Sequence, residues 1–259
     1  MRPVFVSIII PVLNSQKTLE NSILSVISQT YNFKELIIID GGSTDDSIEV
    51  IKKYSDSISY WCSEKDRGIS HAFNKGYLKS KGDYIYFLGA GDLFENNQIL
   101  FSIFDSLNKD FTGLIAGKIR RVDCLNTHKT LWVSSKPFLL GKFLKISLLF
   151  RMSLHHQGLF THRSFFEKFG LFDESIIYAM DYELLLRAYH EFPPVKFYSI
   201  IIAKWRADGL GISKEEKIYK EYLSIKIMNK IAPKFILNWI HTWTKVKFYL
   251  KNKILINAK

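Results

Sequence analysis

The sequence predicts an α/β fold, built on a mixed, mainly parallel sheet with helices on both faces. Four continuous apolar runs, each about the length of a buried strand, alternate with helical patterns through the first hundred residues. Strands joined through helices pair in parallel, and the helices then cover the faces of the sheet. With 259 residues, of which 47% are hydrophobic, the chain is long enough to bury one sizeable core.

The apolar runs and the patterns between them predict the elements of the first half. The strands are expected at 4–10, 35–40, 58–63 and 83–89. Leu19, Ile23 and Ile27 recur every fourth residue, which is the pattern of one apolar helix face. Ser43 and Asp46 have the spacing of a capping box, so the next helix is expected to begin there.

The second half is organised less regularly. The pattern loosens from Asp92 to about residue 150, after which a helix is predicted over 181–192 and an apolar strand over 195–205. A glycine-rich segment follows at 206–213. This block is too short for an independent core, so we expect it to complete the same domain and to build the other wall of a cleft.

The sequence favours an intracellular protein without a membrane span. Pro11 and the polar residues after it interrupt the first apolar run, which therefore resembles a buried strand more than a signal peptide. The longest uncharged stretches fall short of the roughly 18 to 20 apolar residues that cross a bilayer. Cys62 and Cys124 lack a metal-ligand spacing, so two ordinary buried thiols are expected.

Positive charge is concentrated at the end of the chain. Eight lysines and no Asp or Glu lie between Tyr222 and Lys259, so +8 of the net charge of +11 belongs to this tail. Nucleic acid and an anionic membrane surface are both chemically possible partners for such a segment.

Polar residues close each of the four predicted strands, in "PVLN", "DGGSTDD", "SEKDRG" and "GAGD". In an open parallel sheet, ligands bind beyond the carboxyl ends of the strands, so these residues form the candidate site. Carboxylates gathered at one edge repel each other unless a cation or a hydrogen-bonding ligand offsets them. The chain has no GxxxxGK[ST], HExxH or GxSxG, and no GxGxxG opens a helix, which removes the best evidence for several other enzyme classes.

Six segments, in this order and spacing, resemble inverting family 2 glycosyltransferases of the GT-A fold, a Rossmann-like fold of nucleotide-diphospho-sugar transferases. They are "SIIIPVLNSQKTLENSILSVISQTY", "ELIIIDGGSTDDS", "SEKDRGISHAFNKG", "GDYIYFLGAGD", "HHQGLFTHRSFFEKFGLFDE" and "DYELLLR". The resemblance covers roughly residues 5–213, and is strongest to small bacterial enzymes that build lipopolysaccharide, capsule or colanic-acid-like polymers.

The resemblance implies a nucleotide-sugar donor site at the first strand ends. Asp40 matches the family acid that contacts the nucleotide, where a carboxylate would accept hydrogen bonds from base or ribose, unless it only caps the following helix. Pro11 and Asn14 match the end of the first strand beneath the nucleotide, with a plain turn as the alternative.

Three further residues match the donor pocket. Asp66 corresponds to a family pocket residue, unless it belongs to a solvated loop. Asn74 and Lys75 match a helix facing the diphosphate, where a lysine would offset phosphate charge; a solvated helix face is the alternative. His71 is a departure, since relatives often carry Asp there.

The segment "GAGD" occupies the place of the family's DxD motif. The resemblance implies that Asp92 ligates Mg²⁺ or Mn²⁺ bridging the donor diphosphate, although a turn residue is the alternative. Ala90 stands where many relatives carry the first acid. One carboxylate must therefore share the ion with diphosphate oxygens and water, and metal binding without substrate should be weak.

Asp181 matches the family's catalytic base. A carboxylate at a helix start beside the cleft could accept the proton of an acceptor hydroxyl, although a helix cap is the alternative. Glu183 is a weaker candidate. One base and no enzyme nucleophile implies a single displacement. The resemblance to the family likewise implies inversion at the sugar. His156 and Gln157 match an "HQ" pair on the acceptor side of family members, with ordinary packing as the alternative. Residues 209–213 match a mobile loop of the family that closes over the donor.

The expected organisation is a GT-A domain over 1–213, with a nucleotide-sugar half at 1–110 and an acceptor half at 111–213. Residues 214–259 form a basic amphipathic helical extension. Its lysines and tryptophans suit an anionic bilayer surface, which would present a lipid-linked glycan acceptor on the cytoplasmic side of the plasma membrane. A helical tail packed on the domain with a solvated lysine face is the alternative.

Three other functions compete with the transferase. A degenerate, non-catalytic sugar-nucleotide-binding or membrane-binding member of the family is suggested by Ala90 and His71. A nucleic-acid-binding protein is suggested only by charge and lacks a recognised module, so no nucleic-acid partner is expected. A nucleotidyltransferase would need a glycine- and arginine-rich N-terminal loop, which the chain lacks.

Overall fold

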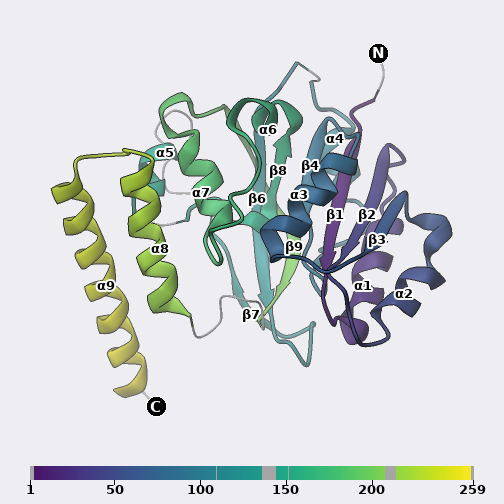
Figure 1. Ribbon diagram of the computed structural model, residues 1–259, viewed down its shortest axis with the longest axis horizontal. Coiled ribbons are helices and arrows are strands. Elements are labelled where there is room, and N and C mark those ends of the chain that lie inside the picture. The colour runs from purple at the N-terminus through teal and green to yellow at the C-terminus, as the bar shows by residue number, and fades with distance from the viewer. Residues whose placement is uncertain (1–2, 109, 136–143, 151, 208–213, 258–259) are drawn as a thin grey trace.

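The computed structural model describes residues 3–108, 110–135, 144–150, 152–207 and 214–257 (Figure 1). Within this part of the chain, nine strands form one sheet in the order β3-β2-β1-β4-β8-β6-β9-β5, and β7 pairs with β6. The strands are β1 (Val6–Val12), β2 (Lys34–Asp40), β3 (Tyr60–Ser63), β4 (Tyr84–Phe87), β5 (Leu93–Phe94), β6 (Leu114–Val122), β7 (Thr130–Val133), β8 (Leu159–His162) and β9 (Val195–Arg206).

The sheet is mixed and mainly parallel, as predicted. β1 pairs in parallel with β2 and β4, and β2 with β3. β8 is antiparallel to both β4 and β6, and β9 is parallel to β6, so β1, β2, β3, β4, β6 and β9 all run in one direction. The carboxyl ends of β1 to β4 therefore meet at one edge.

Helices cover both faces of the sheet. They are α1 (Gln16–Ile27), α2 (Ser47–Lys53), α3 (Ile69–Lys79), α4 (Ile99–Phe104), α5 (Leu144–Leu148), α6 (Arg163–Phe169), α7 (Met180–Arg187), α8 (Glu215–Met228) and α9 (Lys234–Asn257), with short 3-10 turns η1 (Ser55–Ser57), η3 (His156–Gly158) and η4 (Tyr189–Glu191). Ile8 and Ile9, successive residues of β1, belong to different apolar clusters. Helices α1, α2 and α4 pack in the first cluster, and α3, α6, α7 and α8 in the second.

The four strands expected in the first half are present, and β1 continues through Pro11, which lies opposite Ile39 of β2. The sequence patterns did not predict β6, which lies between β8 and β9 in the sheet. Gly117, Lys118 and Arg120 interrupt its apolar residues, so it lacks the continuous run on which the other strands were recognised.

The expected start of α2 is wrong. The helix begins at Ser47, with Asp46 at the N-cap position and no side-chain capping bond. Ser43 does not cap it, because its hydroxyl donates to Asp40 instead. The predicted capping pair thus lies in the loop before the helix.

The basic tail is helical, as expected, and is joined to the fold. Helix α8 packs against α7, and α9 packs against α8 (Figure 1). Ile225 of α8 belongs to the second apolar cluster, and Leu237 and Ile240 of α9 are buried. The division expected at residue 213 stays a prediction, since the linking residues 208–213 lie outside those described.

Two expectations about the chain as a whole can be compared with the structure. Cys62 and Cys124 are free thiols, but both are partly exposed rather than buried. Among the described residues, no helix combines the length and the apolar content that crossing a bilayer requires.

Helix α3 crosses β1 at Gly76, which predicts a stability effect. A Cβ at this position would lie 2.4 Å from Cγ2 of the fully buried Ile9. We expect Gly76→Ala to lower the free energy of unfolding by about 1 to 3 kcal/mol through overpacking, despite the better helix propensity of alanine. Urea denaturation followed by circular dichroism measures the change.

Leu78→Ala is the matched control, because Leu78 lies on the same helix and is 69% exposed. It should change the free energy of unfolding by no more than about 0.5 kcal/mol. A Gly76→Ala variant as stable as the wild type would contradict the close packing of α3 on β1.

Candidate active site

The loops that follow β1 and β2 are held to each other by side chains. Asn14 adopts a positive φ of 49°, and its side-chain oxygen accepts a hydrogen bond of 2.8 Å from the backbone of Thr44. Its own N–H donates to the Ser43 hydroxyl at 2.8 Å. Asn14 therefore joins the two strand ends, and Pro11 lies within the sheet just before them.

Asp40, the last residue of β2, is fully buried and organises its surroundings. Its carboxylate accepts hydrogen bonds from the backbone of Gly42 and Ser43 and from the hydroxyls of Ser43 and Ser63. A buried carboxylate needs such donors, since an unsatisfied charge there costs several kcal/mol. Both oxygens of the carboxylate already accept hydrogen bonds from the protein. The expected contact of Asp40 with a nucleotide therefore stays a prediction.

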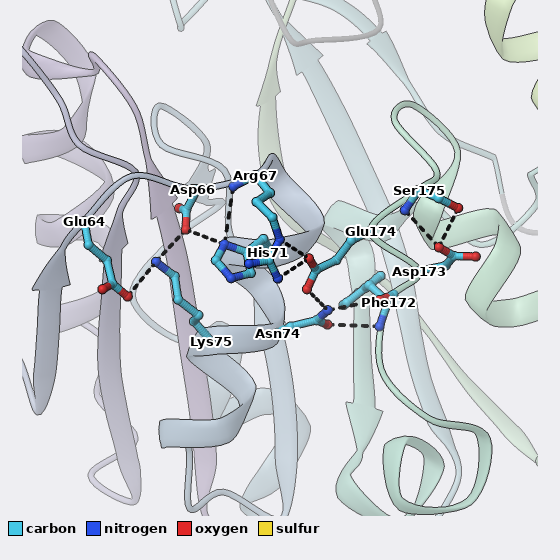
Figure 2. A network of polar contacts seen from close by, with 10 residues as sticks. All are labelled: Glu64, Asp66, Arg67, His71, Asn74, Lys75, Phe172, Asp173, Glu174 and Ser175. Carbon is cyan, nitrogen blue, oxygen red and sulfur yellow. Dashed lines mark hydrogen bonds and ion pairs between the residues drawn. The ribbon is translucent and has the colours of Figure 1, made fainter.

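Asp66 lies against the Asp40 loop and forms a charged cluster with α3 (Figure 2). A Cβ on Gly41 would lie 3.1 Å from Asp66 Oδ2. Asp66 Oδ1 lies 2.5 Å from Lys75 Nζ and 3.0 Å from His71 Nδ1. An Asp at position 71 would repel Asp66, whereas the imidazole is a partner, so the departure at this position is compensated locally.

Lys75 links Asp66 to a second acid. Its ammonium lies 3.0 Å from Glu64 Oε1. Burial alone would lower the pKa of Lys75, but the hydrogen bonds to Asp66 and Glu64 raise it, so it remains a cation. The side chain is only 16% exposed. Its charge is already paired with two carboxylates, so the expected contact of Lys75 with a diphosphate stays a prediction.

Asn74 connects α3 to the segment before α7 (Figure 2). Its side-chain amide accepts from the backbone N–H of Phe172 and donates to the carbonyl of the same residue, both at 3.0 Å. It also donates to Glu174, which pairs with Arg67 at 2.6 Å. Both ends of the amide are thus engaged in joining α3 to residues 172–174, and a contact of Asn74 with diphosphate stays a prediction.

Asp92 ends the loop after β4 and is buried. Its Oδ1 accepts from the backbone N–H of Arg206 at 2.9 Å, which ties the loop to the end of β9. Two glycines make room here, since a Cβ on Gly89 would lie 2.7 Å from Asp92 Oδ2 and one on Gly91 would lie 3.0 Å from Arg206 Cδ. Gly91 also has a φ of 115°, which disfavours other residues.

The loop fits a divalent cation only in a limited way. No group of three or more His, Cys, Asp or Glu that could hold a metal ion occurs among the residues the structure describes. Asp92 offers hard carboxylate oxygens and Ala90 offers none from its side chain. This donor set suits Mg²⁺ or Mn²⁺ that is held mainly by other oxygens, such as those of a diphosphate and water.

Asp181 opens α7 and faces a small, mostly apolar cavity. The cavity measures about 20 Å³ and is lined by Phe87, His156, Leu159, Thr161, Phe165, Phe166, Phe172, Asp181, Leu184 and Leu185. Burial raises the pKa of Asp181, and the neighbouring His156 and the backbone N–H of Tyr182 offset this only in part. A carboxylate with a raised pKa is better matched to accepting a proton.

His156 lies between Asp181 and the end of β4. Its ring stacks on Phe87 with centroids 5.8 Å apart, and burial lowers its pKa while the charge of Asp181 opposes this. Within the described part of the chain, its Nε2 is buried without a hydrogen-bond partner. Gln157 follows in the same turn, and its backbone carbonyl accepts a hydrogen bond from the Tyr86 hydroxyl. Both residues thus adjoin the last strand before Asp92.

The structure gathers the expected residues at one edge of the sheet, in two groups. Asn14, Asp40, Asp66, Asn74 and Lys75 surround the ends of β1 to β3, while His156 and Asp181 adjoin β4, which leads to Asp92. Glu183 lies elsewhere, buried in an ion pair with Arg187. The expected donor loop, 209–213, lies outside the described residues.

Two residues of this region were not singled out in the sequence. Arg206 lies beside the Asp92 loop, and Glu221 of α8 accepts hydrogen bonds from the backbone before α7. Its place as the first residue of the glycine-rich segment 206–213 was the sequence signal for Arg206. Glu221 gave none, because its partners lie more than forty positions away.

Comparisons with known proteins agree with this architecture. The model of Glycosyl transferase family 2 matches residues 7–169. An uncharacterized glycosyltransferase of Rickettsia typhi is 34% identical over 182 residues, which are 69% of this chain and 57% of that protein. One of Mycobacterium tuberculosis is 28% identical over 216 residues, 81% of this chain and 78% of that protein. The chain thus spans little more than half the length of the rickettsial relative.

Solved structures share the fold at low sequence identity. S. aureus TarS 1-349 in complex with UDP-GlcNAc matches 92% of this chain and 70% of that one, with a TM-score of 0.71 and 16% identity. The mannosyltransferase PcManGT from Pyrobaculum calidifontis, in complex with GDP-Man and Mn²⁺, matches 94% of this chain and 72% of that one, with a TM-score of 0.65 and 15% identity. The chain has the GT-A fold and belongs to glycosyl transferase family 2.

Proposed function

We propose that the protein is a glycosyltransferase that moves a sugar from a nucleotide-diphosphate sugar to a hydroxyl of a glycan acceptor. The observation that carries the proposal is that two acids of different environment both lie beside the carboxyl end of β4. Asp92 ends the loop after β4, and Asp181 adjoins the ring stack at the end of β4 with a pKa raised by burial. One suits a diphosphate-bound cation and the other a proton.

The donor is proposed to lie over the ends of β1, β2 and β3. Lys75, held there by Asp66 and Glu64, would offset phosphate charge, and Asn14, Asp40 and Asp66 shape the loops beneath. Arg206 lies against Gly91 and would place a second cation near the diphosphate. The TarS and PcManGT complexes, with UDP-GlcNAc and GDP-Man, support this class of donor.

Asp92 would hold the Mg²⁺ or Mn²⁺ ion together with the donor diphosphate. When bound, the cation supplies Lewis-acid stabilisation of the charge that develops on the leaving diphosphate. The Mn²⁺ in the PcManGT complex supports a divalent ion of this kind. Among the described residues Asp92 is the carboxylate proposed for the ion, and diphosphate oxygens and water would complete the coordination.

Asp181 is proposed as the general base. Its carboxylate takes the proton of the acceptor hydroxyl while that oxygen bonds to the anomeric carbon, and the bond to the diphosphate oxygen breaks. No second nucleophile takes part in this scheme, so the configuration inverts in a single displacement. His156 and Gln157 lie on the acceptor side, next to this carboxylate.

The acceptor is proposed to be a lipid-linked glycan of a surface polysaccharide, met at the inner face of the plasma membrane. The outer face of α9 carries Phe235, Trp239 and Trp243 at four-residue spacing, and they are 74%, 65% and 46% exposed. The exposed Lys230 and Lys234 lie on the same segment. Exposed tryptophan with lysine suits the headgroup layer of an anionic bilayer.

A second candidate is a non-catalytic member of the family that binds a sugar nucleotide. Ala90 favours it, because the loop keeps a single acid where a pair would hold the metal better. This candidate predicts binding without turnover. Turnover of any donor by the wild type excludes it.

Asp181→Asn should lower kcat for release of nucleoside diphosphate by about 100- to 10,000-fold, because the amide cannot accept the proton. Nucleotide affinity should stay within about twofold, since the residue lies on the acceptor side. Coupled assays with a panel of UDP-, GDP- and dTDP-sugars and Mn²⁺ measure the rate, and calorimetry measures the affinity.

Glu191→Gln, at an exposed ion pair after α7, is the control and should leave kcat unchanged. Equal rates for Asp181→Asn and wild type would reject Asp181 as the base.

The pH dependence of kcat offers an independent check on the same carboxylate. A base must be ionised to work, so activity should fall as the pH drops through the pKa of Asp181. Since burial raises that pKa, the acidic limb should lie above the ordinary aspartate value of about 3.9. A limb at or below that value, measured on the folded enzyme, would contradict the assignment.

Replacing both Trp239 and Trp243 by alanine should weaken binding to vesicles containing phosphatidylglycerol by about tenfold or more. The reason is the loss of two exposed aromatic side chains from the proposed contact face. Wild-type binding should also weaken with salt and be weaker to phosphatidylcholine vesicles. Vesicle co-sedimentation measures all three effects.

Trp132→Ala provides the matched control, because Trp132 is 43% exposed but lies on β7, far from α9 in the chain. Its binding should equal that of the wild type. Binding that ignores the α9 tryptophans and the lipid charge would instead favour a tail that only packs on the domain.

A further inference from the structure

Helix α8 holds the segment that leads into α7. The carboxylate of Glu221 accepts hydrogen bonds from three successive backbone N–H groups: Ile177 at 3.2 Å, Tyr178 at 3.0 Å and Ala179 at 2.8 Å. These residues directly precede Met180 and Asp181. A single side chain from the C-terminal region thus binds the backbone on which Asp181 is presented.

Helix α7 begins with a hydrogen bond of 2.8 Å from the backbone N–H of Tyr182 to Asp181 Oδ1. Its N-cap residue is Ala179, which has no side chain able to accept a hydrogen bond. Helix starts leave backbone N–H groups without partners, and a Ser, Thr, Asp or Asn usually supplies the acceptor. Glu221 binds the N–H groups of the three residues just before the helix rather than those inside its first turn, and its negative charge is favourable at a helix N-terminus.

The next residue of α8, Tyr222, contacts the residue that follows Asp181. Tyr222 packs on Tyr182, with ring centroids 4.3 Å apart. Burial raises the pKa of Tyr222, and the charge of Asp181 adds to this, so the phenol and the carboxylate interact. Ala179, just before α7, is therefore held by Glu221, and Tyr182, in the first turn of α7, is held by Tyr222.

We propose that Glu221 is a positioning residue for Asp181. By binding the three N–H groups before α7, it fixes the direction in which the helix starts and hence where the Asp181 carboxylate lies. The proposal rests on the proposed role of Asp181 as the base. It makes α8 part of the catalytic architecture, whereas the sequence suggested only a basic extension.

The chemistry of the proposed step explains why such a contact matters. A general base must lie within about 2.6 to 3.2 Å of the group that it deprotonates. A displacement of roughly 1 Å can cost about 100-fold in rate, even when binding is intact. Hydrogen bonds from N–H groups to a carboxylate are short and strong, which suits a positioning role.

The test compares Glu221→Ala, Glu221→Gln and Glu216→Gln with the wild type. Glutamine keeps the length of the side chain but has one acceptor oxygen and no charge, so its effect should be smaller than that of alanine. Glu216 lies on the same helix in an exposed pair with Lys220 and is the matched control. All variants are first checked by circular dichroism and thermal unfolding.

Two readouts separate positioning from general stability. In Glu221→Ala, kcat with the donor used by the wild type should fall about 10- to 100-fold, while the donor KM and nucleotide affinity stay within about twofold. Hydrogen exchange should quicken at the amides of 177–179 and stay unchanged in the strands β1 to β4. Glu216→Gln should change neither readout.

Two results would overturn the proposal. A folded Glu221→Ala variant with unchanged kcat would show that the contact does not position the base. Joint loss of nucleotide affinity and kcat, with faster exchange throughout the sheet, would assign Glu221 a general structural role. Asp181→Asn, assayed in parallel, separates these results from failure of the proposed function. Full activity in that variant would show that Asp181 is not the base.

Discussion

Parallel pairing of β1 with β2 and β4 is the constraint on which the candidate site depends. It brings the ends of these strands to one edge, where Asp40 is the last paired residue of β2 and Asn14 and Asp92 follow β1 and β4. Carboxylates at such an edge must find donors or cations. Asp40 finds donors in its own loop and in Ser63 of β3, and Asp66 pairs with Lys75, so both carboxylates have partners within the protein.

The second wall of the site is attached by polar contacts rather than by the sheet alone. Asn74 of α3 binds the backbone of Phe172, and Glu221 of α8 binds the backbone before Asp181. Both are side chains that hold a loop from outside it. The proposed acceptor side therefore depends on helices from distant parts of the chain, and α8 connects this wall to the exposed aromatic face of α9.

The part of this arrangement that could be predicted from sequence is the part encoded locally. Continuous apolar runs identified β1 to β4, and the acids after them gave the sheet edge. Strand β6 was missed because Lys118 and Arg120 alternate with its apolar residues. The engagement of Asp40 and Asn74 within the protein, and the contact of Glu221 with 177–179, depend on tertiary neighbours that no local pattern encodes.

The central claim is that this sheet edge binds a nucleotide diphosphate through a cation held by Asp92. Calorimetric titration of UDP, GDP and dTDP, with and without Mn²⁺, into the wild type and Asp92→Ala tests it most directly. The account predicts that one nucleotide binds the wild type in a Mn²⁺-dependent manner, and that Asp92→Ala abolishes this dependence. Binding that ignores both the metal and Asp92, or the absence of binding by all three nucleotides, would contradict it.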